Sequence, residues 1–97
     1  MLRVGIIGVG TVGASVANIL RDNKNIITAR AGKEIVATIG VVSNLHKIRD
    51  VDIKLTDNID DVLNDDSIDV VVELMGGIDK PNEIVRKALL KGKAVVT

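Results

Sequence analysis

Residues 3–13 of the chain read RVGIIGVGTVG, an apolar run that leads directly into a glycine-rich turn. Gly8, Gly10 and Gly13 match the spacing G-x-G-x-x-G, which also occurs by chance in glycine-rich loops. Here an apolar strand precedes the glycines and an amphipathic helix follows them, so the context predicts a dinucleotide-binding turn. Gly8 is expected to permit the tight turn, Gly10 to let a pyrophosphate approach the backbone, and Gly13 to let the helix pack closely. The N–H groups and the dipole of the helix start favour phosphate.

The rest of the chain continues this alternation of strands and helices. The expected elements are a first helix that ends near residues 22–25, a short helix over 26–31 closed by Gly32, a strand over 35–42, a short edge strand over 53–56, a short helix within 57–66, a buried strand over 69–74, a helix from near Pro81 to Leu90, and a strand that opens at 94–96. This order predicts a Rossmann-type, doubly wound parallel α/β sheet in three layers, namely the first mononucleotide-binding half plus adjoining strands.

Composition narrows the class of protein further. The chain has 97 residues, 46% of them hydrophobic, which is enough for one modest core, so residues 1–97 are expected to form one domain. Lys plus Arg (13) balance Asp plus Glu (13) and aromatic residues are absent, which argues against nucleic acid or an acidic membrane as a partner. Without cysteine there is no disulfide framework, and with no charged and apolar leader we expect a cytoplasmic protein.

The end of the second long strand is where many nicotinamide-binding proteins place an acid on the ribose diol. Here the strand runs into Ser43 and Asn44, with no acid, and His46, Lys47 and Arg49 follow. A hydroxyl, an amide and cations suit a 2′-phosphate, which favours NADP or use of both dinucleotides. The alternative is that the basic residues are a solvated loop, and both interpretations remain open.

Three groups of acids are candidates for chemistry. Glu73 ends a buried strand beside the glycine turn 75–77, where it could orient that turn or a nicotinamide, or serve the structure alone. Asp60-Asp61 and Asp65-Asp66 could be paired carboxylates for acid/base work or a hard metal, but a solvated helix face with a cap is the simpler interpretation. We therefore predict no metal site.

Four segments together are more specific than the glycine turn alone. They are residues 8–13 (GVGTVG), 31–35 (AGKEI), 72–78 (VELMGGI) and 92–97 (GKAVVT). In this combination they resemble the N-terminal part of the homoserine dehydrogenases, and the resemblance covers all 97 residues. It implies a family that interconverts aspartate 4-semialdehyde and homoserine with NADPH or NADH, on the route to threonine, methionine and isoleucine.

The resemblance also implies which residues bind the cofactor. Residues 8–13 would hold the pyrophosphate, while Ser43 stands where many members carry an arginine for the 2′-phosphate and Lys47 matches a basic position further along. Met75, Gly76 and Thr97 would lie along the nicotinamide, mainly through backbone atoms. The implied cofactor-binding residues are Gly8, Val9, Gly10, Thr11, Val12, Gly13, Ser43, Lys47, Met75, Gly76 and Thr97.

Family members continue beyond the residue that matches Thr97 with a substrate domain that holds the catalytic residues. We therefore expect no catalytic residue within these 97, and expect the chain to bind NAD(P) weakly and not to turn over alone. The full-length enzyme is expected to be a homo-oligomer. The alternatives are a free-standing dinucleotide-sensing module and the cofactor domain of another two-domain reductase, because one fold serves many functions.

Overall fold

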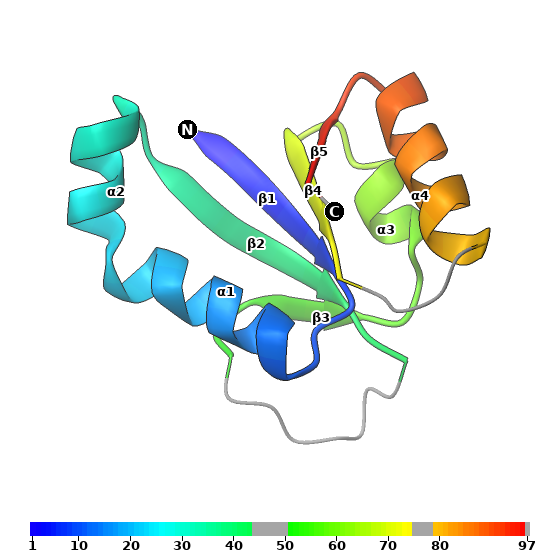
Figure 1. Cartoon of the computed structure of the whole chain (residues 1–97), viewed down its shortest axis with the longest axis horizontal. Helices are drawn as coiled ribbons and strands as arrows, with labels where there is room; N and C mark the ends of the chain where they lie inside the picture. The colour runs from blue at the N-terminus through cyan, green and yellow to red at the C-terminus, as the bar shows by residue number, and fades with distance from the viewer. Residues whose placement is uncertain (44–50, 75–78, 97) are drawn as a thin grey trace.

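The computed structural model describes residues 1–43, 51–74 and 79–96, and gives only the main chain of Thr11, Val12 and residues 79–82. These residues form a five-stranded parallel sheet in the order β3-β2-β1-β4-β5, with helices on both faces (Figure 1). The strands are β1 (Leu2–Ile7), β2 (Ile35–Val41), β3 (Lys54–Thr56), β4 (Val70–Glu73) and β5 (Ala94–Val96), and the helices are α1 (Thr11–Asp22), α2 (Lys24–Ala31), α3 (Asp60–Leu63) and α4 (Asp79–Leu90). The predicted parallel α/β sheet in three layers is confirmed.

Two clusters of apolar side chains show the three layers. On one face of the sheet, Ala17 of α1 packs in a cluster with Ile6 of β1. On the other face, Leu63 of α3 and Ala88 of α4 pack in a cluster with Val71 of β4. The strands between them are apolar and β-branched because a parallel sheet is covered on both sides.

The predicted boundaries are confirmed to within a few residues. The short second helix begins at Lys24 and not at 26, and α4 begins at Asp79, two residues before Pro81. Pro81 is tolerated there because the first N–H groups of a helix have no intrahelical partner. Gly32 closes α2 with φ of 77°, in the left-handed conformation that glycine adopts without a Cβ penalty. No residue of α2 is buried, so this helix contributes little to the core.

A buried lysine joins the start of β5 to the segment between α3 and β4. Lys93 is 5% exposed, and its Nζ donates hydrogen bonds to the main-chain oxygens of Asp65 (2.6 Å) and Ile68 (2.8 Å). Its ammonium group therefore supplies a charged donor to two main-chain carbonyls outside the strands. This role was not predicted from the sequence, since a lysine after a helix-ending glycine is usually solvent-exposed.

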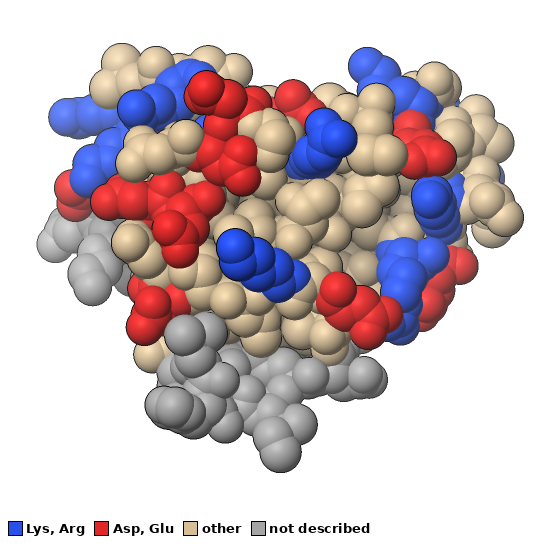
Figure 2. All heavy atoms as spheres, turned by 180° about the vertical axis from the view of Figure 1, so that it is seen from behind, with Lys and Arg blue, Asp and Glu red and all other residues tan. Residues whose placement is uncertain are grey.

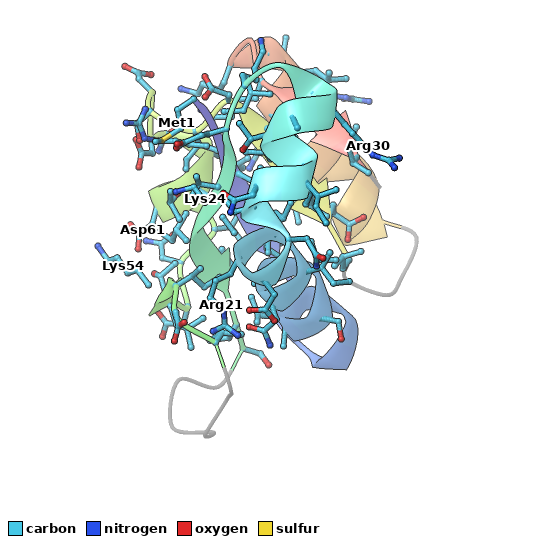
Figure 3. The ribbon with its side chains drawn as sticks, turned by 90° about the vertical axis from the view of Figure 1, so that its left-hand side faces the viewer. Met1, Arg21, Lys24, Arg30, Lys54 and Asp61 are labelled. Carbon is cyan, nitrogen blue, oxygen red and sulfur yellow. The ribbon has the colours of Figure 1, made fainter. Side chains whose placement is uncertain are left out.

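Charged side chains of both signs lie on the outside of the molecule. The face opposite to the view of Figure 1 carries both acidic and basic groups among uncharged residues (Figure 2). Lys54 of β3 is exposed and points away from the sheet (Figure 3). None of the described helices is long and apolar enough to cross a bilayer.

Candidate dinucleotide-binding site

The carboxyl ends of the parallel strands meet at one edge of the sheet. Ile7, which ends β1, is in register with Val41 of β2 and Glu73 of β4, and Val41 is in register with Thr56 of β3. The glycine turn follows Ile7 directly, so it lies in the middle of this edge, between the ends of β2 and β4. Ligands of open α/β sheets bind at this edge, where the strand order reverses.

The glycine turn is fixed to the neighbouring strand by two hydrogen bonds to one acceptor. The N–H groups of Gly8 (2.9 Å) and Val9 (3.1 Å) both donate to the main-chain oxygen of Val41. Gly8 has φ of 97°, a conformation that side chains disfavour, which confirms the predicted reason for glycine at this position. Val41 thus orients the turn through its carbonyl, a role that no side-chain pattern in the sequence reveals.

The other two glycines differ in their surroundings, and the close packing predicted at Gly13 is confirmed. A Cβ on Gly13 would lie 2.6 Å from the main-chain oxygen of Gly8, so only glycine lets α1 pack this closely on the turn. A Cβ on Gly10 would meet no atom within 4 Å, so the space beside Gly10 is open. Gly10 is the N-cap of α1, provides no side-chain cap, and no acid occupies the first turn of the helix. The helix start therefore offers donors and a positive dipole end to an anion.

Val9 faces the interior. It is 2% exposed and belongs to the apolar cluster beneath α1, so any contact with a ligand must come from its main chain. The side chains of Thr11 and Val12 are not described, and their main chain forms the first turn of α1. The three glycines have no side chain and Val9 turns its own inward, so these four residues offer main-chain groups, which is the chemistry that binds a pyrophosphate.

Ser43 lies at the predicted place beyond β2. Val42 is buried and donates its N–H to the oxygen of Thr56 (2.8 Å), and Ser43, the next residue, is exposed at the carboxyl edge. The remaining predicted site residues lie outside the described part of the chain. They are Lys47, Met75, Gly76 and Thr97.

The acids predicted as candidates lie in different environments. Glu73 is 4% exposed at the carboxyl edge. Asp61 accepts a hydrogen bond from the hydroxyl of Thr56, and Asp65 accepts from the hydroxyl (2.6 Å) and the N–H (2.9 Å) of Ser67. The hydroxyl of Ser67, followed by its N–H, holds the pKa of Asp65 below the ordinary value of 3.8. Within residues 1–43, 51–74 and 79–96, no three acids, histidines or cysteines are grouped as metal ligands would be.

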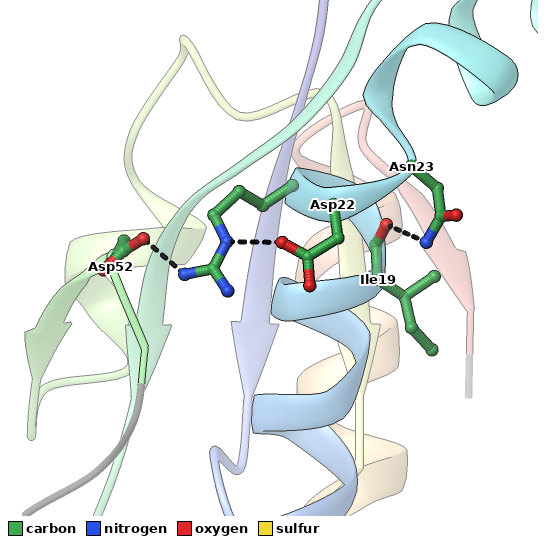
Figure 4. Close-up of polar contacts among 5 residues, drawn as sticks. Ile19, Asp22, Asn23 and Asp52 are labelled. Atoms are coloured by element: carbon green, nitrogen blue, oxygen red, sulfur yellow. Dashed lines mark hydrogen bonds and ion pairs between the residues drawn. The ribbon is translucent and has the colours of Figure 1, made fainter.

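Arg21, in the last turn of α1, holds the chain that enters β3. Its guanidinium donates to Asp22 (3.0 Å) and to Asp52, while the side-chain amide of Asn23 donates to the oxygen of Ile19 (Figure 4). Hydrogen bonds to Asp22 and then Asp52 raise the pKa of Arg21. The group therefore stays a cation at every relevant pH, and its role is to tie α1 to β3.

A cavity of about 200 Å³ beside Arg21 is not part of this site. It lies between the second half of α1, the start of β2 at residues 35–37, and Ile53. Ala37 is four residues from Val41, which corresponds to about 13 Å along a strand. The cavity is therefore remote from the glycine turn, which lies at the carboxyl edge of the sheet.

A parallel sheet in the order 3-2-1-4-5, with a glycine turn and an uncapped helix start at its carboxyl edge, defines a dinucleotide-binding domain of the Rossmann type. A family model described as the NAD binding domain of homoserine dehydrogenase matches residues 8–97. The chain belongs to this family.

Sequence relatives and solved structures agree with this assignment. The homoserine dehydrogenase of Helicobacter pylori is 40% identical over 99% of this chain and 23% of that protein, and the enzyme of Pseudomonas aeruginosa is 43% identical over 99% of this chain and 22% of that protein. The crystal structure of a homoserine dehydrogenase from Thiobacillus denitrificans superimposes with a TM-score of 0.91 at 43% identity, over 97% of this chain and 22% of that one. The chain thus spans about a quarter of the length of these relatives.

Proposed function

We propose that residues 1–97 are the NAD(P)-binding domain of a homoserine dehydrogenase that interconverts aspartate 4-semialdehyde and homoserine. The family match and the relatives that carry this name support the reaction. When bound, the nicotinamide gives or takes the hydride. This chain binds and orients the dinucleotide, while the substrate residues and the proton donor would belong to the remainder of the enzyme.

The open space at Gly10, next to the uncapped start of α1, is the observation that supports dinucleotide binding most directly. In this proposal the main chain of residues 8–13 holds the pyrophosphate. Ser43 and Lys47 would lie toward the adenosine 2′ position, and Met75, Gly76 and Thr97 toward the nicotinamide. Because Ser43 brings no carboxylate to the end of β2, NADP is accepted at least as readily as NAD.

The same assignment also suggests where the complete enzyme acts, how it assembles and which pathway it serves. The complete protein would act in the cytoplasm, as a homo-oligomer, in the biosynthesis of threonine, methionine and isoleucine. The 97 residues alone would bind the dinucleotide without turnover, because the groups that receive the aldehyde would belong to the remainder of the enzyme.

Gly10→Val tests the site. A Cβ at this position meets no atom within 4 Å, so we expect the fold to persist while two methyl groups occupy the phosphate position. Titration with NADPH and NADH, followed by nicotinamide fluorescence, is free of Trp and Tyr signals because the chain has neither. We expect affinity to fall about 100-fold with an unchanged far-ultraviolet circular dichroism spectrum. Unchanged affinity in a folded variant would refute the assignment of the site.

A further inference from the structure

Val9, the residue between the first two glycines of the turn, anchors that turn in the core. It is 2% exposed, and its N–H donates to the main-chain oxygen of Val41 (3.1 Å). Its apolar cluster includes Ile6 of β1 and Ala17 of α1. The height of the turn above the sheet therefore depends on how deeply this one side chain is seated.

Gly40 of β2 provides the space that Val9 occupies. A Cβ on Gly40 would lie 2.4 Å from Cγ2 of Val9, 3.0 Å from Cδ1 of Ile53 and 3.5 Å from Cδ2 of Leu55. The shortest of these contacts is far inside van der Waals distance, and Val9 is β-branched, so rotation about χ1 gives it few alternatives. A glycine inside an apolar strand is a known signal of close approach by another group.

We infer that Gly40 and Val9 are paired positioning residues, which set the turn at the height at which the main chain near Gly10 meets the pyrophosphate. Gly40 touches no ligand in this scheme and acts only through Val9. The inference rests on the proposed dinucleotide binding. It adds a residue on the neighbouring strand, outside the glycine motif, that controls affinity.

The test compares the 97-residue chain with Gly40→Ala, Val9→Ala and the double variant, by titration with NADPH. Gly40→Ala should lift the turn and weaken binding about tenfold, and Val9→Ala should weaken it about threefold because the turn loses its anchor. In the double variant the new methyl group at position 40 enters the space that Val9 vacates. Affinity should then return to within about twofold of the original chain, which a loss of stability alone would not produce.

Gly5→Ala is the matched control. A Cβ on Gly5 would lie 2.6 Å from Cγ1 of Val62 and 3.3 Å from Cγ2 of Ile68, in the cluster on the opposite face of the sheet. This variant should lose stability in urea as Gly40→Ala does, yet keep the dinucleotide affinity of its folded fraction within about twofold.

The outcomes separate this inference from the proposed function. If the original chain binds neither NADPH nor NADH, the proposed function fails and the inference with it. If the original chain binds NADPH, the inference alone fails in either of two cases. In the first, Gly40→Ala binds NADPH as tightly as Gly5→Ala does. In the second, adding Val9→Ala to Gly40→Ala does not restore the affinity. If Gly40→Ala does not fold, the single variant Val9→Ala is the remaining test. An NADPH affinity of Val9→Ala equal to that of the original chain would then overturn the inference.

Discussion

Replacing Lys93 by Met tests the most unusual polar group of the core. Methionine is unbranched like lysine and one atom shorter, and it cannot donate hydrogen bonds. The main-chain oxygens of Asp65 and Ile68, which the ammonium group now contacts at 2.6 and 2.8 Å, would lose this charged donor, although the oxygen of Asp65 would keep the N–H of Ile68 (3.1 Å). The start of β5 would then be tied to the segment between α3 and β4 only through the main chain, by the N–H of Ala94 and the oxygen of Asp69 (3.0 Å).

The size of the effect follows from these two bonds. A hydrogen bond to a charged group contributes about 1.5–3 kcal/mol, so two predict a gross loss of about 3–6 kcal/mol. Burying a thioether in place of an ammonium recovers part of this, because the charge no longer has to be desolvated. We expect the free energy of unfolding to fall by about 2–4 kcal/mol, a large share of the roughly 5–15 kcal/mol that a domain of this size possesses.

Urea unfolding followed by far-ultraviolet circular dichroism measures this change. Lys91→Met is the control, since Lys91 is exposed and the substitution removes the same charge two residues away. It should unfold within about 0.5 kcal/mol of the original chain. A Lys93→Met variant as stable as Lys91→Met would show that the two bonds have no net value and would refute the reasoning.

Two further predictions concern a glycine and a carboxylate. Gly13→Ala places a methyl group 2.6 Å from the main-chain oxygen of Gly8. It should lower the free energy of unfolding, measured in urea, by about 1–3 kcal/mol and also weaken NADPH binding. A change in only one of these two quantities would contradict the close packing of α1 on the turn. Asp65, whose pKa is held below 3.8 by Ser67, contributes stability that is fully present above this value and is lost as the pH falls through its folded pKa. In Ser67→Ala the pKa of Asp65, measured by carboxyl NMR titration, should rise toward 3.8, and an unmoved pKa would show that the hydroxyl is not its main cause.

The order and direction of the elements could be predicted from the sequence because local signals agree with the fold. Apolar runs of strand length, helical spacing of apolar residues and glycines at element ends each act over a few residues. The short β3 was also predicted from Ile53–Thr56, although only three of these residues pair with β2. Pro81 misled the estimate of where α4 begins, because a proline is accepted anywhere in the first turn.

Some features of the glycine turn could be predicted from the sequence and others could not. The separate reasons for Gly8, Gly10 and Gly13 were predicted because each belongs to a pattern with a known physical basis. The contact of Val9 with Gly40 could not be predicted, since it depends on the pairing of β1 with β2, which places Ile6 opposite Gly40. The same holds for Lys93, whose acceptors are main-chain oxygens that any residue would offer.

The exposed helix α2 has a consequence for how the molecule opens. Its eight residues include none that is buried, so its unfolding exposes little apolar surface. Its amide protons should therefore exchange with solvent through local opening, at rates far above those of β1, whose residues 4–7 are all buried. Residues 24–31 are thus the natural place for a spectroscopic label or an inserted peptide, because this segment can open while the sheet still holds the glycine turn in place.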